Sequence, residues 1–565
     1  MRQVVVLGLD AATLEIINPL MEEGLLPNFQ SICRRGVHGA LRSTLHPLSP
    51  PAWSSFITGK NPGKHGIYDF VVHKPGSYEL LYTNGGMRKG KSLWRILSDE
   101  GKKVAVVNVP MTYPPENVNG VMISGFDSPG VDSDFIRPGS VYKEITRDLG
   151  TYLLRDYPQG HTPASFIEHI EELFEFHKKL TFYILENYEW DFFMIVFSVL
   201  DIVQHGYWQY MDPAFTGISA EDRKKFGNVI RDFYIKTDGL LGDLLEKVKD
   251  KNLIIMSDHG AGPCYKAIFI NNWLKDIGLL EYKRSSRDGN VSSGIKDMAF
   301  NVLAQIHYQI KNRVSPEGLE RLKRAFPGLR HKVKSRLVFG EIDWDRTKVY
   351  SFGRESTNLF INMNGKFPGG IVMPGREYDE LISFLKEKLM ELRDPDSGEP
   401  VVEGIYRGSE IYHGESMESA PDLLITWRNS EYTSWPGYND RNRKIFETSL
   451  DHSDYSDWSQ LQKGGNHRPY GIVFMDGEGI KRNEVINSAR IIDLAPTILY
   501  WMGLAIPDDM DGKVLLDAFD DAYKAGNSPQ KSATAGLQPA DSSETIYSEE
   551  EKKAIEERLK SLGYV

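Results

Sequence analysis

Seven side chains that could bind metals or attack an ester are placed close to the ends of apolar runs. They are Asp10, Ser49, Asp201, His205, Asp258, His259 and His467. Carboxylates and imidazoles without thiolates form a ligand set that suits zinc or manganese. Two such ions can clamp the attacking and leaving oxygens of an in-line displacement. The residue types therefore indicate a two-metal site that cleaves esters.

The spacing of these residues is compatible with shared metal sites. Asp201 and His205 are four residues apart, which puts both side chains on one face of a helical turn. Asp258 and His259 are adjacent and would diverge on a regular strand, so they converge only if the strand has already ended. A glycine directly after His259 makes that break reasonable. We therefore expect both pairs to lie at strand ends.

Each of these features also has an ordinary structural interpretation. A strand-end Asp10 can cap a helix, the Asp201/His205 pair can be a surface pair, and SDHG can be a simple turn. His467, in the late segment KGGNHRPYG that we predict as a loop, can satisfy a hydrogen bond in the core. Their joint occurrence after successive predicted strands favours a site, because ligand sites of open α/β sheets gather at the strand ends.

The elements that would position these residues alternate between apolar strands and amphipathic helices. Continuous apolar runs are typical of parallel strands that are covered on both faces. Strands are predicted at Val4–Leu9, Val104–Val109, Phe192–Val199 and Leu253–Met256, and helices at 92–103, Pro163–Asn187, Asp222–Lys249 and Glu377–Leu392. The alternation predicts an α/β fold with a doubly wound core sheet and helices on both faces. The sequence DLAPT at Asp493 predicts a capped helix start.

The chain divides into five segments by composition. We expect a catalytic core over 1–281 and 339–521, interrupted by a basic helical insertion, or cap, at 282–338. The insertion is either a solvated helical face or a surface that meets phosphates or a membrane. A linker is predicted at 522–547 and a helix at 548–565, which would dock on the core or on a second subunit in a homo-oligomer.

The overall composition narrows the partners and the compartment. The 565 residues carry a net charge of −11 and 41% hydrophobic residues, which supports a sizeable core and argues against a nucleic-acid polymer as partner. Two distant cysteines form no disulfide framework, and no apolar run is long enough to span a bilayer. The simplest interpretation is a soluble cytoplasmic protein that acts on a small phosphorylated substrate.

Over roughly Val4–Leu515, the chain resembles the alkaline phosphatase superfamily, specifically its type I phosphodiesterase/nucleotide pyrophosphatase family. The motifs that carry the resemblance are GLDA at Gly8, SPPAWSSFITG at Ser49, NPGKHGI at Asn61, DIVQH at Asp201, SDHG at Ser257, GNH at Gly465, DLAPT at Asp493 and DG at Asp511. The resemblance implies an alkaline-phosphatase-like fold and a metal-dependent phosphoric ester hydrolase. A phosphomonoesterase, phosphomutase or phosphonate hydrolase with the same site, and a non-catalytic binding protein, remain alternatives.

The resemblance also implies roles for the seven residues. One metal would be held by Asp201, His205 and His467, and the other by Asp10, Asp258, His259 and the nucleophile. Both ions would be divalent, with zinc favoured over manganese. The family nucleophile lies ten residues before the Gly of the TG pair, and counting back from Gly59 gives Ser49. A covalent phosphoseryl intermediate would follow. The local rivals are Ser43, Thr44, Ser54 and Ser55.

The chain departs from the family where the substrate would bind. Nucleotide-cleaving relatives often carry an Asn a few residues after HGI, whereas this chain has Asp69 there. An unshielded Asp69 carboxylate would repel phosphate, so Lys64 and Arg354 are candidate replacements, although each can be an ordinary surface charge. Trp53 stands where sulfatases of the superfamily carry Arg. The acidic residues at 451–454 and 508–511 are interpreted as a loop and a turn.

Overall fold

A computed structural model describes residues 2–154, 162–283, 342–353, 357–435, 444–448, 464–533 and 547–561. Its centre is a nine-stranded sheet with the strand order β20-β2-β19-β9-β1-β8-β5-β6-β7. The strands are β1 (Val4–Leu9), β2 (Val37–Arg42), β5 (Val104–Val109), β6 (Gly120–Ser124), β7 (Ile136–Arg137), β8 (Phe192–Phe197), β9 (Asn252–Met256), β19 (Tyr470–Asp476) and β20 (Glu484–Val485). The adjacent strands β9, β1, β8, β5 and β6 run parallel, while β19 is antiparallel to both of its neighbours.

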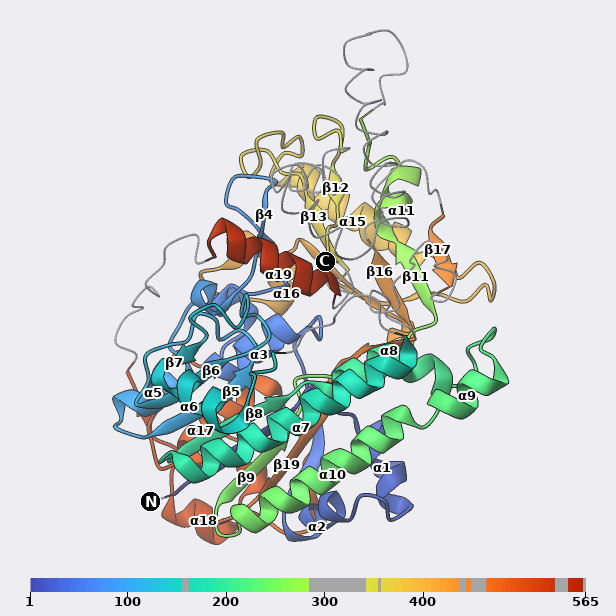
Figure 1. The fold of residues 1–565 in the computed structure, drawn as a ribbon. Coiled ribbons are helices and arrows are strands. Elements are labelled where there is room, and N and C mark those ends of the chain that lie inside the picture. The colour runs from blue at the N-terminus through green and yellow to red at the C-terminus, as the bar shows by residue number, and fades with distance from the viewer. Residues whose placement is uncertain are drawn as a thin grey trace.

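Helices cover both faces of this sheet, which confirms the predicted α/β core. Along β1, Val5 and Leu7 belong to one buried cluster and Val4 and Val6 to another, because successive side chains point to opposite faces. The first face packs against α1 (Leu14–Glu22), α2 (Pro27–Arg35), α7 (Pro163–Asn187), α8 (Val199–Met211) and α10 (Val229–Lys247), and the second against α3 (Ser49–Thr58), α5 (Leu93–Asp99) and α17 (Leu494–Trp501). Figure 1 shows α7, α8 and α10 lying together across the first face.

Two predicted helices differ in detail from the structure. The helix expected over Asp222–Lys249 is divided into α9 (Ala220–Phe226) and α10, with Gly227 at the break. Glycine weakens a helix interior because it loses the most backbone entropy. The carboxylate of Asp493 does not cap α17; it accepts bonds from Arg490 and from the Lys513 amide. The preceding 3₁₀ turn, Ile491–Asp493, starts the helical geometry instead.

A second, smaller lobe has its own sheet and its own apolar cluster (Figure 1). Its four strands, in the order β12-β13-β15-β14, are β12 (Val349–Tyr350), β13 (Asn358–Ile361), β15 (Leu423–Trp427) and β14 (Val402–Arg407). The helix α15 (Arg376–Met390) packs on this sheet through Ile382 and Leu385, and α11 (Ile270–Asp276) joins the same cluster. The predicted basic insertion at 282–338 lies almost entirely outside the described residues, so its role as a cap stays a prediction.

The C-terminal part of the chain returns to the core. Within the segment expected to be a linker, α18 (Asp521–Gly526) and β22 (Lys531–Ser532) are ordered. The last helix, α19 (Glu549–Ser561), follows Tyr547, whose ring stacks on Tyr113 with centroids 5.5 Å apart. Ile555 is 2% exposed and belongs to the cluster that underlies the central sheet. The helix therefore docks on the core of its own chain.

No helix within the described part of the chain combines the length and apolar character that crossing a bilayer would require.

Candidate active site

The predicted metal ligands come from the C-terminal ends of three adjacent parallel strands and from one short ribbon. Asp10 directly follows β1, and Asp258 and His259 occupy the gap between β9 and β10 (Gly260–Pro263). Asp201 and His205 lie four residues apart on α8, the helix that follows β8. In a parallel sheet these strand ends share one edge, which brings residues far apart in sequence to one place.

His467 lies in a strand rather than in the predicted loop. It belongs to β18 (Gly465–Arg468), which pairs antiparallel with β10 so that His467 faces Ala261. The ribbon also depends on a close approach to α8, since a Cβ atom on Gly465 would lie 2.1 Å from the Gln204 carbonyl oxygen. The loop prediction failed because the partner strand is distant in sequence.

The ligand atoms form two buried groups that could each hold a cation. Asp10, Asp258 and His259 make one group, and Asp201, His259 and His467 make the other, with the ligand atoms of each within 4.8 Å of one another. His259 is common to both, which differs from the two separate triplets expected from sequence. His205 completes the arrangement, with its Nε2 atom 3.1 Å from Asp201 Oδ1 and 3.0 Å from His467 Nε2.

The imidazole rings are held by backbone carbonyls in one tautomer. The Nδ1 atoms of His205, His259 and His467 lie 3.0 Å from the carbonyl oxygens of Gly465, Gly260 and Pro47, respectively. A carbonyl only accepts, so each Nδ1 carries the proton and each Nε2 presents a lone pair to the site. Two lone pairs face each other between His205 and His467, which is favourable only with a cation between or beside them.

Electrostatics point to the same conclusion. The carboxylates of Asp10, Asp201 and Asp258 are at most 1% exposed and lie close together. Burial is the largest influence on the pKa of Asp258 and raises it, a hydrogen bond with Asp10 lowers it, and the nearby Asp201 carboxylate again raises it, so the net shift is upward. Burial also lowers the pKa of His467 to about 3, so that imidazole is neutral. Clustered buried carboxylates beside neutral imidazoles are stabilised by added positive charge, which a bound cation would provide.

One oxygen of Asp258 gives direct support for a bound cation. Among the described residues, no hydrogen-bond donor reaches the buried Oδ2 atom of Asp258, although its Oδ1 accepts from the Ala11 amide at 3.4 Å. Buried carboxylate oxygens are normally satisfied by a donor or by a metal ion. The donor set, of three carboxylates and three imidazoles, fits divalent cations.

Ser49 begins the helix that packs against the second face of the sheet. Pro50 and Pro51 occupy the first turn, where a missing amide hydrogen costs nothing, and Gly59 ends α3 at φ 65°. The Oγ atom of Ser49 lies 3.4 Å from His259 Nε2. Of its local rivals, Ser55 contacts His65 Nε2 at 3.0 Å and Thr44 donates to the His46 carbonyl.

Two of the candidate substrate-binding residues, Lys64 and Asp69, are engaged in contacts within the protein. Lys64 binds the Asp511 carboxylate at 2.6 Å, so it forms a structural ion pair with the turn at 508–511. Asp69 is 3% exposed and accepts from the Phe70 amide and from Asn358 Nδ2. Arg354 and the acidic loop at 451–454 lie outside the described residues.

The residues that orient the site were missed by the sequence analysis. They include Gln204, which stands directly before His205 in DIVQH, and Ser257, which precedes Asp258. Gln204 is 1% exposed in the structure. In the sequence, the available signal was a polar amide directly beside a candidate ligand. The carbonyls of Pro47 and Gly465 had no signal, because every residue carries one.

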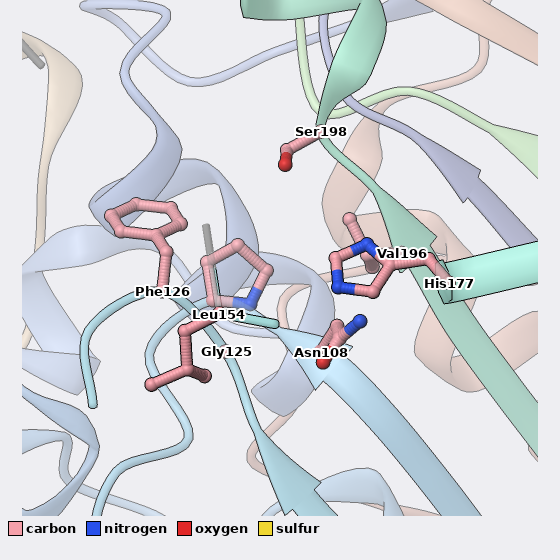
Figure 2. Close-up of a pocket in the computed structure, with 8 residues that line it drawn as sticks. Asn108, Gly125, Phe126, Leu154, His177, Val196 and Ser198 are labelled. Atoms are coloured by element: carbon pink, nitrogen blue, oxygen red, sulfur yellow. The ribbon is translucent and has the colours of Figure 1, made fainter. Parts of the chain in front are cut away.

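A small pocket lies near the same edge, beside the start of α8 (Figure 2). It is lined by Asn108, Pro110, Gly125, Phe126, Leu154, His177, Val196 and Ser198. Its volume is about 10 Å³, which is room for a single water molecule. The seven predicted site residues do not line it.

The chain as a whole was compared with solved structures. Murine ectonucleotide pyrophosphatase/phosphodiesterase 5 with AMP is 12% identical at a TM-score of 0.47, covering 92% of this chain and 100% of that one. Phosphonoacetate hydrolase from Sinorhizobium meliloti 1021 is 15% identical at a TM-score of 0.50, covering 88% and 94%. The latter similarity supports the fold alone. No curated protein sequence matches the chain.

The family comparison covers most of the chain. The profile of type I phosphodiesterase/nucleotide pyrophosphatase matches residues 4–433. That range contains seven of the nine strands of the central sheet, α3 with Ser49, and every predicted ligand except His467; β19, β20 and His467 lie beyond its end. The chain therefore belongs to the type I phosphodiesterase/nucleotide pyrophosphatase family, within the alkaline phosphatase superfamily.

Proposed function

We propose that the protein is a phosphodiesterase-type hydrolase in which two divalent cations, zinc or alternatively manganese, assist the Ser49 nucleophile. The observation that carries this proposal is the contact of Ser49 Oγ with His259 Nε2, at 3.4 Å, inside a buried cluster of carboxylates and imidazoles. We assign Asp201, His205 and His467 to one cation and Asp10, Asp258 and His259 to the other. When bound, the cations would favour the Ser49 alkoxide and neutralise charge on the phosphoryl oxygens.

The chain's own residues support a two-step displacement. In the first step, Ser49 Oγ forms a bond to phosphorus while the bond to the leaving oxygen breaks, and the leaving alcohol gains a proton. Water then attacks the phosphoseryl group, which frees Ser49 and the product. The N-terminus of α3 lies at Ser49, where its partial positive charge favours a phosphoryl anion.

The substrate that we propose is a small phosphoester rather than a nucleic-acid polymer, in keeping with the net charge of −11. Lys64 and Asp69 could contact the substrate only if they exchanged their present protein contacts for it. We propose a cytoplasmic location, which suits a chain with only two cysteines, Cys33 and Cys264.

The test compares a nucleophile variant and a matched control variant on two substrates. Metal-depleted protein reloaded with zinc or manganese is assayed with bis-p-nitrophenyl phosphate and p-nitrophenyl phosphate. We expect the diester to be preferred, and Ser49→Ala to lower kcat by at least about 10³-fold while two ions per chain remain bound. Ser54→Ala, on the same helix, is the matched control and should retain activity.

Three results would change the proposal. Full activity of Ser49→Ala would disprove the nucleophile assignment. Preference for the monoester, or for a phosphonate in a wider panel, would keep the site and change the substrate class. Absence of metal-dependent turnover on all these substrates would favour a non-catalytic binding protein.

A further inference from the structure

The turn that follows Asp10 has a conformation that its own residues do not favour. Ala11 has φ 60°, in the left-handed region that residues with a side chain seldom adopt. Ala11 and Ala12 are both fully buried, so water cannot satisfy the backbone groups of the turn. The Ala12 amide donates to the Leu9 carbonyl at 3.0 Å, and the carbonyls of Ala11 and Ala12 need donors from elsewhere in the fold.

Three side chains from three different elements hold this turn. Gln204 Nε2, on α8, donates to the Ala11 carbonyl at 3.0 Å. Ser257 Oγ, after β9, donates to the Ala12 carbonyl at 2.8 Å. The Tyr234 hydroxyl, on α10, accepts from the Thr13 amide at 3.1 Å. Three successive residues are thus each tied to another part of the fold.

Gln204 has a special place among these contacts. Its Nε2 atom donates both to the Ala11 carbonyl and to the Leu200 carbonyl, at 3.0 and 2.9 Å, while its Oε1 atom accepts from the Tyr234 hydroxyl at 3.1 Å. Both carbonyls can only accept, so the nitrogen of the Gln204 amide must face them, and this determines the orientation of the amide. One carbonyl adjoins Asp10 and the other adjoins Asp201, which we assign to different cations.

We propose that Gln204 and Tyr234 are positioning residues that hold the Asp10 ligand group and the Asp201 ligand group at the separation needed for two cations. This inference rests on the proposed two-cation function. Gln204 links the two backbones directly, and Tyr234 holds Gln204 and the end of the turn together. Gln204 is 1% exposed and Tyr234 is fully buried, so we expect neither side chain to touch the substrate.

The experiment measures cation binding directly as well as activity. Metal-depleted wild-type protein, Gln204→Met and Tyr234→Phe are titrated with Zn²⁺ by calorimetry, and cobalt-loaded samples are examined by visible absorption. Loss of an outer hydrogen bond to a metal site typically weakens binding 10–100-fold. We expect Gln204→Met to bind at least one cation about 10-fold more weakly, with an altered cobalt spectrum. We also expect a lower kcat and a nearly unchanged KM, because the substrate contacts are retained.

A milder variant and a matched control separate positioning from simple stability. Tyr234→Phe removes one hydroxyl from an otherwise unchanged ring, and we expect a smaller loss of cation affinity in the same direction. Thr237→Val removes another buried hydroxyl of α10, which donates to the Phe233 carbonyl within the helix. This control should lose some stability and bind Zn²⁺ as wild type does.

The possible outcomes are distinct. Wild-type affinity and an unchanged cobalt spectrum in Gln204→Met and Tyr234→Phe would overturn the positioning role. An equal loss of affinity in Thr237→Val would also overturn it, because the effect would then be one of general stability. If the wild-type protein itself bound no cations, the proposed function would fail before this inference was reached.

Discussion

The three candidate ligand histidines are oriented by backbone carbonyls rather than by carboxylates. Each carbonyl fixes the proton on Nδ1 and leaves Nε2 for a cation. The carbonyls of Pro47 and Gly465 can orient these imidazoles only if the segments that carry them are held in position. The chemistry of these side chains therefore depends on loops and short strands that the chain folds against α8.

Removal of bound cations should destabilise the protein, because three buried carboxylates would lose their compensating charge. We expect dialysis against a chelator to lower the melting temperature and zinc to restore it. At a free zinc concentration 100 times Kd, the stabilisation is about 2.7 kcal/mol for one site. Calorimetric melting with and without zinc measures it.

A matched pair of variants tests where this response arises. Asp258→Asn should lose much of the zinc-dependent gain. Asp238→Asn should keep it, because the Asp238 carboxylate caps α2 through the Asn28 and Phe29 amides, away from the site. An equal gain in both variants would contradict the proposed ligand set.

At the level of elements, the loops that follow β5 and β6 are joined by one buried carboxylate. Asp127 accepts from the Met111 amide at 3.1 Å and from the Tyr113 amide at 2.9 Å. Burial raises the pKa of Asp127 to about 6, although these amides lower it. The same loops form one wall of the pocket in Figure 2 and the platform on which Tyr547 stacks.

This carboxyl group should make stability depend on pH in a defined direction. The pKa of Asp127 is higher in the folded state than in the unfolded state, so the folded state binds the proton more tightly. The stabilisation that this proton gives to the folded state is complete below the unfolded pKa, near pH 4. The contribution is lost as pH rises through about 6, and amounts to on the order of 3 kcal/mol.

The measurement is the free energy of unfolding between pH 4 and 7 for wild type and Asp127→Asn. As pH rises, the free energy of unfolding of the wild type should fall relative to that of Asp127→Asn. The comparison isolates Asp127 because the two proteins share all other titrating groups. A constant difference over this range would show that Asp127 keeps the same protonation in the folded and unfolded states.

At the level of the whole molecule, α19 and β1 contribute side chains to the same buried cluster. Ile555 and Tyr547 are buried in the cluster that also contains Val5 and Leu7 of β1. Tyr113 donates to Glu551 Oε1 at 2.6 Å, and Tyr547 donates to the Asp127 carbonyl at 2.9 Å. The C-terminal helix therefore stabilises the loops near the edge of the sheet that carries the site.

Truncation of Ile555 tests this contribution. Ile555→Ala should lower the free energy of unfolding by about 2–5 kcal/mol, because it removes buried apolar atoms and leaves a cavity. Glu557→Ala, at an exposed position on α19, should change it by less than about 0.5 kcal/mol. Denaturant unfolding of both variants provides the values, and equal stabilities would indicate that α19 detaches readily in solution.

The sequence was sufficient to predict the elements whose signals are local. The bounds of β1, β5 and α7 agree with the runs Val4–Leu9, Val104–Val109 and Pro163–Asn187, because apolar periodicity and flanking caps lie within each segment. It also predicted that Asp201 and His205 share a helical face, since their spacing is a property of one helix.

Tertiary structure alone decided how distant segments meet. Pairing of β18 with β10 puts His467 beside His259. A local sequence pattern cannot predict a partner strand that is about 200 residues away. Contacts between distant segments also form the second lobe, the ion pair of Lys64 with Asp511 and the docking of α19. Sequence determines which groups are available for chemistry, whereas the parallel strand order sets which of them lie together, because their shared edge collects residues from strands that are far apart along the chain.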